Sequence, residues 1–303
     1  MSTMNPGVEN IALSLKKKPS SPSSLFGLLM TGLSGLCLTL TIIPLFALLG
    51  FVSYKGFSRI FENFPTIFTQ LPPPPGLSGG GLANSILGTL IVVSLATLIA
   101  VPIGVLAAVY LSEFSGDSKL ANGIRFATNV LAGVPSIISG VFAFGLFVAP
   151  LVKDGRGLLG YSAVAGAIAI AVLMLPTIIR TTDDALDIVP QDVRWAALGV
   201  GAYNFQTVLK IVLPAALPSI LTGVTLAVAR AAGETASLIF TVLFSNFWPR
   251  SIFEPIATLS VLVFNFAVVP FAPQQELAWA GALILVFLVL MTSIAARLIT
   301  RKS

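Results

Sequence analysis

The chain has 303 residues, of which 56% are hydrophobic and only 10% are charged, and its formal net charge is +5. Soluble domains carry roughly 25% charged residues, so this composition excludes a soluble globular protein and indicates a membrane protein. The sequence contains no His and a single Cys, which excludes His-based zinc sites, His-ligated haem and the Ser-His or Cys-His pairs of proteases.

Long charge-free windows divide the chain into candidate membrane spans. A bilayer core takes about 20 apolar residues as a helix. Continuous apolar runs favour helices over membrane β-strands, in which apolar and polar residues alternate. We therefore expect an all-α, polytopic membrane protein with six transmembrane helices. The predicted spans are Leu25–Val52, Leu82–Leu111, Phe126–Leu151, Tyr161–Ile179, Ile220–Phe244 and Leu277–Ala296.

The first of these spans is predicted to be a retained anchor, because its apolar run is about twice the 7 to 15 residues of a secretory signal and no convincing cleavage site follows it. A stiff Pro run and a flexible Gly run follow within Leu71–Gly81, which we interpret as an extracytoplasmic linker. The predicted organisation is a cytoplasmic tail over 1–24, the anchor and linker over 25–80, and a core over 81–303.

The stretch Ile256–Phe271 is apolar enough to be a seventh span, but Asn265 interrupts it and Pro270 closes it. With six spans and an inside N-terminus, eleven of the 17 basic residues fall inside, five fall outside and Arg230 lies within a span. This bias follows the positive-inside rule. We therefore predict that both termini are cytoplasmic, that Ile256–Phe271 is interfacial or re-entrant, and that the positive charge reflects topology, so no nucleic-acid partner is expected.

The longest inside segment lies between Arg180 and Lys210 and holds four of the twelve acids of the chain. Pro190 and the acid that follows it predict a short helix with its acidic residues near the positive end, terminated by Gly199 or Gly201. A loop of this length usually has a task. The residues alone leave two interpretations open: a connector lying on the lipid headgroups, or a docking surface for a partner.

Arg230 and Glu234 lie near the middle of an otherwise apolar predicted span, four residues apart. Each charge costs at least about 2.5 kcal/mol at that depth, so neither is expected to face lipid. On one helical face they could neutralise each other as a structural pair. Alternatively, Arg230 offers a forked donor to a passing anion, and Glu234 holds its geometry or accepts a proton.

Other residues near these spans are predicted to shape a path. Gly223 and Gly233 permit another helix to approach closely, and Pro102 and Pro135 are expected to bend their helices. Ser136, Ser139 and Thr235 could donate hydroxyl hydrogen bonds to an oxyanion. Such hydroxyls also bond to the backbone of their own helix.

Residues 195–214 read W-A-A-L-G-V-G-A-Y-N-F-Q-T-V-L-K-I-V-L-P, which resembles the EAA motif of the integral-membrane subunits of ABC importers. Trp195 stands where that family usually has Glu. The resemblance implies that the loop forms coupling helices seated in a cleft of a separate ATPase. The matching positions are Ala196, Ala197, Gly201, Ile211, Leu213 and Pro214.

The run Ala216–Thr241, reading A-L-P-S-I-L-T-G-V-T-L-A-V-A-R-A-A-G-E-T-A-S-L-I-F-T, is similar to the PstA family of phosphate-specific ABC permeases. This resemblance covers most of the chain from about Leu82 onward. It implies six helices of the ABC importer permease type and a location in the bacterial inner membrane. It also implies three partners: a PstC-like sister permease, a PstB-like ATPase dimer and a PstS-like phosphate-binding protein.

The sequence has no Walker motif, so the chain is not expected to hydrolyse ATP; ATP and Mg would be bound by partner subunits, and no cofactor or metal is expected here. The predicted function is phosphate import by alternating access, with Arg230, Glu234, Thr235, Ser136 and Ser139 along the transport path. Two alternatives are another oxyanion, such as sulfate or molybdate, and, remotely, an intramembrane aspartyl enzyme using Asp183 or Asp184.

Overall fold

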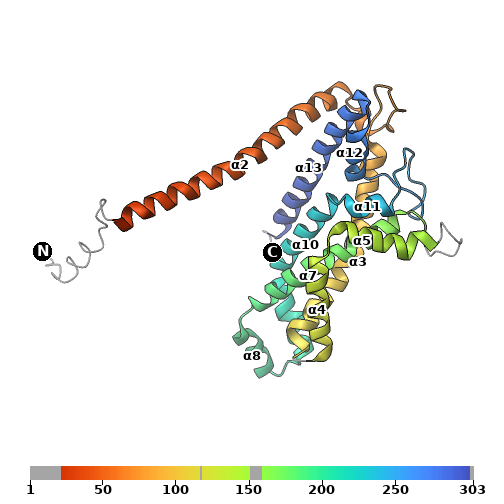
Figure 1. Ribbon diagram of the computed structural model, residues 1–303. Coiled ribbons are helices and arrows are strands. Elements are labelled where there is room, and N and C mark those ends of the chain that lie inside the picture. Colours follow the sequence, from red (N-terminus) through yellow and green to blue (C-terminus); the bar gives the residue numbers. More distant parts are fainter. Residues whose placement is uncertain (1–21, 117, 151–158, 301–303) are drawn as a thin grey trace. The chain divides into compact units, whose positions relative to one another are not determined.

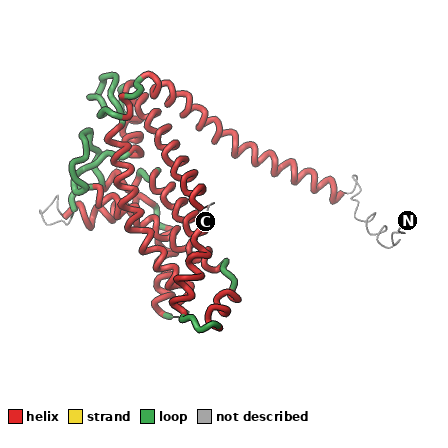
Figure 2. Tube along the Cα trace, turned by 180° about the vertical axis from the view of Figure 1, so that it is seen from behind, coloured by secondary structure: helices red, strands yellow, loops and turns green. Residues whose placement is uncertain are grey.

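The computed structural model describes residues 22–116, 118–150 and 159–300. Within these ranges the chain is helical, with helices joined by loops and no strand (Figure 2). It divides into two compact units, residues 1–54 and 55–303. Most of the predicted tail over 1–24, and the predicted end of the third span at Leu151, lie outside the described residues.

The described part of the first unit is one apolar helix, the start of α2 (Pro22–Glu62). None of its most apolar 18-residue window is buried within the chain. Its threonines satisfy their hydroxyls locally: Thr31 and Thr41 each donate to a backbone carbonyl four residues earlier, at 2.9 and 2.8 Å. Cys37 is exposed on the same helix. These features fit the predicted membrane anchor.

The second unit begins with the end of α2 and continues as a bundle (Figure 1). The long helices α3 and α7 pack against each other, and α10 packs against α7 and α13. In chain order, the helices are α3 (Ala83–Val109), α4 (Lys119–Gly133), α5 (Ser136–Ala143), α7 (Ala163–Asp187), α8 (Gln191–Gly199), α9 (Asn204–Thr207), α10 (Leu213–Ala232), α11 (Ala236–Thr241), α12 (Leu259–Val268) and α13 (Ala272–Thr300).

Short π-helical turns extend three of these helices: η2 (Tyr110–Phe114) follows α3, η3 (Phe144–Val148) follows α5 and η4 (Val208–Val212) precedes α10. A 3-10 turn, η1 (Thr66–Phe68), lies before α3. Among the described residues, five helices are long and apolar enough to cross a membrane, and there are six if one bent pair of helices counts as a single span. The all-α, polytopic architecture predicted from the sequence is confirmed.

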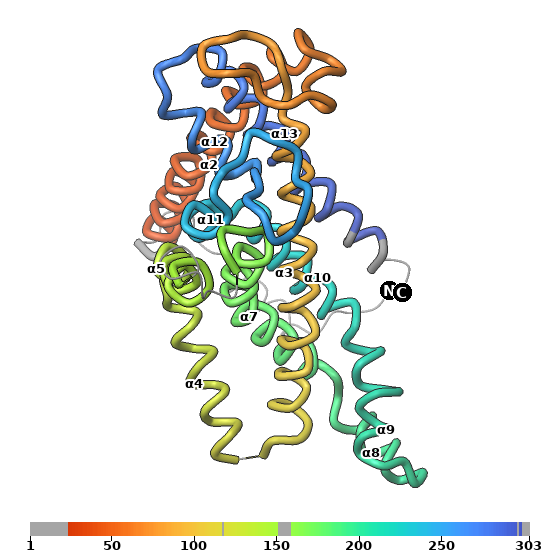
Figure 3. The backbone as a smooth tube through the Cα atoms, turned by 90° about the vertical axis from the view of Figure 1, so that its right-hand side faces the viewer, coloured from red at the N-terminus to blue at the C-terminus, as the bar shows by residue number. Residues whose placement is uncertain are grey.

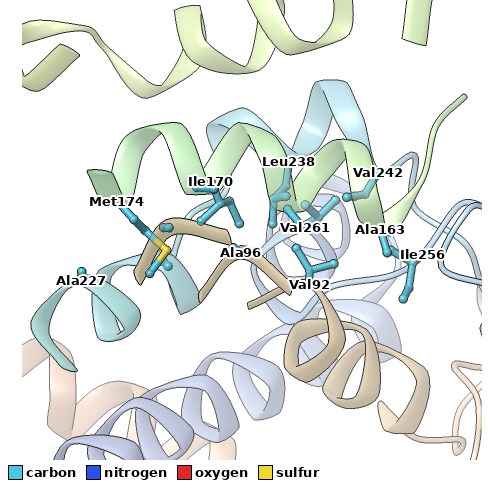
Figure 4. Packing of buried hydrophobic residues seen from close by; sticks show 14 of the residues in the cluster. Val92, Ala96, Ala163, Ile170, Met174, Ala227, Leu238, Val242, Ile256 and Val261 are labelled. Carbon is cyan, nitrogen blue, oxygen red and sulfur yellow. The ribbon is translucent and has the colours of Figure 1, made fainter. Parts of the chain in front are cut away.

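The core of the bundle forms around α7, which is more buried than any other candidate span among the described residues. Small side chains face it from the neighbouring helices: Ala96 on α3 and Ala227 on α10 are fully or almost fully buried (Figure 4). Ile170 and Met174 of α7 fill the space between them. Because lipid tails are as apolar as Leu, close packing of small residues rather than the hydrophobic effect brings membrane helices together.

The third predicted span is not one continuous helix. It consists of α4 and α5, with a bend of 107° between α4 and the helix that begins with α5. Val134 and Pro135 are extended at the bend, as expected for Pro and for the residue before it. The predicted bend at Pro135 is confirmed, whereas Pro102 lies inside α3, which continues as one candidate span to Phe114.

The fifth predicted span, Ile220–Phe244, was placed too far along the chain. The apolar helix runs from Asn204 to Ala232, and α11 starts only after a break at residues 233–235. The charge of Lys210 suggested a boundary, but Lys210 lies inside η4 and is exposed, so it does not end the helix. Gly233 caps α10 instead, with its N–H bonded to the carbonyl of Arg230 at 3.2 Å.

The apolar stretch at 256–271, considered above as a seventh span, contains α12. This helix has ten residues and is too short to cross a bilayer. The first turn of α12 is held by the hydroxyl of Thr89, which accepts a hydrogen bond from the N–H of Leu259 at 2.8 Å. Leu259 and Leu262 are fully buried in a cluster shared with α13. The stretch therefore packs inside the bundle rather than forming a seventh span.

Gly223 on α10 lies against Thr181 of α7, and a Cβ atom added there would overlap the threonine side chain. We expect Gly223→Leu to destabilise the fold by about 1–3 kcal/mol, because overpacking forces the two helices apart. The measurement is the thermal unfolding midpoint in detergent. Gly123→Leu is the matched control, since nothing lies within 4 Å of a Cβ at that position of α4. Equal midpoints for the two variants would contradict close packing at Gly223.

Candidate functional site: a two-arginine cavity and an interhelical loop

Arg230 lies in the last turn of α10 and is exposed in this chain. Its side chain borders a cavity of about 150 Å³ between α4, α7 and α10. Arg180, near the end of α7, borders the same cavity. The remaining lining residues are apolar or neutral, namely Leu131, Ala132, Val134, Leu173, Pro176 and Thr177. Among the residues that the structure describes, the wall of this cavity therefore includes two arginines and no acid.

Arg180 was not among the residues selected from the sequence, where it served only as a boundary of a span. Its Nη2 donates to the Asn129 side-chain oxygen at 2.8 Å, which ties the end of α7 to α4. Two guanidinium groups at one cavity repel each other, and a bound anion relieves this repulsion. Each fork can also donate two parallel hydrogen bonds to an oxyanion. The chemistry of this cavity is thus suited to a small oxyanion.

The prediction that Arg230 and Glu234 share one helical face is wrong. That spacing needs a continuous helix, and α10 ends at Ala232. Glu234 is half-buried in the break, where its backbone carbonyl accepts a hydrogen bond from the Ser260 hydroxyl at 2.8 Å. No salt bridge joins Arg230 and Glu234 among the described residues. Both nevertheless border one narrow space of about 10 Å³ beside α7.

The three predicted hydroxyl residues do not line the cavities that Arg230 borders. Ser139 is buried, and its hydroxyl donates to the carbonyl of Ala169 on α7 at 3.2 Å, so it joins two helices. Thr235 precedes α11 and donates to the Gly233 carbonyl at 3.4 Å. Ser136 is half-buried at the start of α5. Their place on a transport path stays a prediction.

The loop between α7 and α10 contains the short helix predicted after Pro190. Helix α8 begins at Gln191, has Asp192 in its first turn and ends at Gly199. Beyond it, Gly201 has a φ of +90°, which favours Gly. The N–H groups of Gly201 and Ala202 bond to the carbonyls of Leu198 and Ala197, at 3.0 and 3.1 Å. This is the Schellman arrangement, and it turns the chain sharply at the end of α8.

Arg194 anchors α8 to the bundle. Its guanidinium makes a two-pronged ion pair with Glu113 of η2, with Nη2 at 2.7 Å and Nε at 3.3 Å from the carboxylate oxygens. It also donates to the carbonyls of Leu186 and Val189, at the end of α7. The side chains of Arg194 and Glu113 are only 10% and 9% exposed. No local sequence pattern indicates this pair, because its members are 81 residues apart.

The residues that matched the EAA motif lie in and after α8. Trp195 is 65% exposed and Ala196 is also exposed, whereas Ala197 is buried against the bundle. Further along, Ile211 and Leu213 are half-buried, and Pro214 is exposed in the first turn of α10. Several large apolar side chains around α8 face outward, among them Ile188, Val200, Tyr203 and Phe205. A cluster of exposed apolar residues marks an interaction surface.

Figure 3 shows α8 and α9 at the end of the bundle toward which α4 and α10 also run. The loop that connects α2 to α3 lies at the other end. Among the described residues, no group of three or more Cys, Asp or Glu side chains is arranged to hold a metal ion. The two features with the clearest chemistry are therefore the two-arginine cavity and the anchored α8.

The chain is similar in sequence and in fold to membrane subunits of known transporters. Residues 100–303 match the family model described as "Binding-protein-dependent transport system inner membrane component". The chain is 43% identical over 236 residues to the phosphate transport system permease protein PstA of Yersinia pestis, covering 78% of each protein. It is 40% identical to PstA of Haemophilus influenzae, covering 80% of this chain and 84% of that protein.

A solved structure of a bacterial alginate ABC transporter, in complex with an alginate pentasaccharide-bound periplasmic protein, has the same fold. The similarity has a TM-score of 0.68 at 13% identity and covers 94% of this chain and 98% of that one. The MetNI methionine ABC transporter matches with a TM-score of 0.59 at 21% identity, over 73% of this chain and 95% of that one. The chain belongs to the PstA family of phosphate transport permeases, within the inner membrane components of binding-protein-dependent transport systems.

Proposed function

We propose that this chain is the permease subunit of an ATP-driven importer and moves inorganic phosphate into the cytoplasm by alternating access. The observation that carries the proposal is the two-arginine cavity: Arg180 and Arg230 border one space between three helices, and no described acid lines it. A charged side chain within an apolar span is costly and usually marks an ion or substrate pathway. The relatives in Yersinia pestis and Haemophilus influenzae are phosphate transport permeases, and this supports phosphate as the anion.

The chemistry of guanidinium groups supports this assignment. A phosphate ion presents several acceptor oxygens in a tetrahedron, and each Arg fork can engage two of them. Asn129 already holds one nitrogen of Arg180, which fixes the orientation of that fork and leaves its other donors for the anion. Glu234, held at the break after α10, is placed beside Arg230 to steady it or to accept a proton. Thr235, Ser136 and Ser139 remain proposed path residues.

The proposed source of motion is a separate ATPase that docks on α8. The exposed Trp195 and Ala196, with the apolar residues around them, form the contact surface. Arg194 then transmits the position of α8 to η2 and to the end of α7 through its bonds to Glu113 and Leu186. Because Arg180 is on α7 as well, a shift of this helix changes the geometry of the two-arginine cavity.

The remaining partners follow from the same proposal. The chain pairs with a PstC-like sister permease, two copies of a PstB-like ATPase bind on the α8 side, and a PstS-like protein delivers phosphate on the opposite side. ATP and Mg bind to the ATPase rather than to this chain. Both termini then face the cytoplasm of a bacterium, and the chain consists of the tail 1–24, the anchor and linker 25–80, and the permease core 81–303.

The direct test is uptake by the complete complex reconstituted in vesicles with ATP inside. We expect ATP-dependent accumulation of radioactive phosphate that an excess of sulfate or molybdate leaves unchanged. Accumulation of sulfate or molybdate instead would refute phosphate as the substrate while leaving the importer architecture in place. Phosphate entry that needs no ATP would refute the proposed coupling.

Gly201 provides a test of the docking loop. Gly201→Val forces a β-branched residue into a φ of +90°, which costs about 1–2 kcal/mol and loosens the turn after α8. We expect less ATPase to copurify with the permease and phosphate uptake to fall. Gly199→Ala is the matched control, because Gly199 lies within α8 and nothing lies within 4 Å of an added Cβ. Undiminished copurification and normal uptake in Gly201→Val would contradict the docking role.

A further inference from the structure

A second polar cavity of about 210 Å³ lies between α4 and α7. Its charged and polar lining consists of Arg125, Thr128 and Asn129 from α4 and Arg180 and Asp183 from α7. Arg180 also borders the cavity of Arg230, so this arginine lines both spaces. An anion that leaves Arg230 therefore meets a further charged site beside the same α7 helix.

The two arginines of this second cavity are held by contacts that leave donors free. Nη2 of Arg125 donates to the carbonyl of Leu111 at 3.3 Å, at the end of α3. Nη2 of Arg180 donates to Asn129 at 2.8 Å. Neither arginine forms a salt bridge with a described acid. Each guanidinium has five N–H donors, so both can still bind an oxyanion.

Asp183 makes this cavity different from the first one. It lies three residues after Arg180 on α7, so the two side chains share one face of the helix. Asp183 is half-buried and makes no hydrogen bond or salt bridge with a described residue. An ionised carboxylate repels a fully deprotonated anion, but it accepts a hydrogen bond from an anion that still carries an O–H group.

Inorganic phosphate carries at least one proton near neutral pH, whereas sulfate carries none. A site that hydrogen-bonds a substrate O–H rejects an analogue without it, because the buried acceptor is then left unpaired. We propose that the cavity of Arg125, Arg180 and Asp183 is a second phosphate site, in which both arginines hold the anion and Asp183 selects its protonated oxygen against sulfate. The proposal rests on the proposed function, since it places this site on the same phosphate path.

The test uses the complete complex in vesicles, with phosphate and the binding protein outside and ATP inside. The interior, which the α8 side faces, is loaded with phosphate or with sulfate at matched ionic strength, and the initial rate of uptake is measured. For the wild-type chain, internal phosphate is expected to slow uptake and internal sulfate is expected to have no effect. Equal inhibition by the two anions would overturn the proposal.

Asp183→Asn replaces the acceptor with an amide that can donate to sulfate. We expect internal sulfate to inhibit this variant, whereas the wild type should remain uninhibited at a sulfate concentration about tenfold higher. Asp183→Glu, which keeps the carboxylate, should restore the exclusion of sulfate. Asp187→Asn is the matched control, because Asp187 is exposed on the same helix and does not line this cavity.

If internal sulfate leaves the uptake rate of Asp183→Asn unchanged, as in the wild type, the selective role of Asp183 is overturned. If this variant fails to assemble with the ATPase, Asp183→Ser removes the carboxylate with a smaller side chain. Internal sulfate should inhibit phosphate uptake by this variant as well. Failure of the proposed function has a different signature: the wild-type complex would then show no ATP-dependent phosphate uptake, whatever anion the interior holds.

Discussion

Replacing Arg230 with Gln is expected to lower phosphate uptake by about 100-fold or more while leaving the ATPase bound. Gln can donate to an oxyanion, but it lacks the positive charge and the fork. A hydrogen bond to a charged group contributes about 1.5–3 kcal/mol, so losing two of them at the anion exceeds the roughly 2.8 kcal/mol that a 100-fold loss represents. The measurement is the initial rate of ATP-dependent phosphate uptake, with copurification of the ATPase as the assembly check.

Two further variants separate the charge from its shape and position. Arg230→Lys keeps a positive charge but loses the planar fork, so we expect intermediate uptake. Arg250→Gln makes the same chemical change in an exposed loop, away from both cavities that Arg230 borders, and should transport normally. Normal uptake by Arg230→Gln would remove Arg230 from the transport path.

The second large effect is expected at the anchor of α8. Arg194→Ala leaves Glu113 buried without its partner, and breaking one side of a buried ion pair costs about 3–5 kcal/mol. The carbonyls of Leu186 and Val189 also lose their donor. We expect a lower unfolding midpoint for the purified chain, together with loss of phosphate uptake as α8 separates from η2 and α7. Both are measured on the same preparation.

A double variant distinguishes an effect on the stability of the fold from an effect on the coupling between α8 and transport. Replacing both partners, as in Arg194→Met with Glu113→Leu, removes the unpaired charge, and apolar replacement of a buried ion pair is often neutral for stability. The midpoint should therefore recover, while uptake stays low if the ion pair transmits motion. Asp192→Ala, an exposed change on the same helix, should leave the midpoint unchanged. A normal midpoint in Arg194→Ala would show that the pair does not hold α8.

The sequence predicted the helices of the bundle from long apolar runs, because length and hydropathy are local properties. It also located α8, since Pro190, Asp192 and Gly201 are local signals of a helix start and end. The ends of the fifth predicted span were wrong for a physical reason. An exposed charge such as Lys210 does not interrupt a helix, and the actual end depends on Gly233 and on the contact of Ser260 with the chain after it.

The site could be predicted only in part. Arg230 stood out because it is a charge in an apolar run, but its surroundings depend on helices that are distant in the sequence. Arg180 and Asn129 are 51 residues apart, and no periodic pattern links them. Glu113 in η2 gave no local signal of its pairing with the loop after α7. Residue spacing indicates neighbours only along a continuous helix, which is why the relation of Arg230 to Glu234 was predicted incorrectly.

The central claim is that phosphate passes through the cavity of Arg180 and Arg230, and a single cysteine placed there tests it most directly. Thr177 borders both spaces next to Arg230, and the natural Cys37 is first replaced with Ser. A transport-competent Thr177→Cys chain is treated with an anionic thiol reagent during ATP turnover, with and without phosphate. Arg250→Cys, in the exposed loop after α11 and away from both cavities that Arg230 borders, is the control.

We predict that the reagent modifies Thr177→Cys and blocks uptake, that phosphate slows the modification at least tenfold, and that sulfate does not. The control cysteine at 250 should react at the same rate with and without phosphate. Modification of Thr177→Cys at a rate that phosphate does not change, or modification without loss of uptake, would contradict the claim that the anion crosses the membrane at the two arginines.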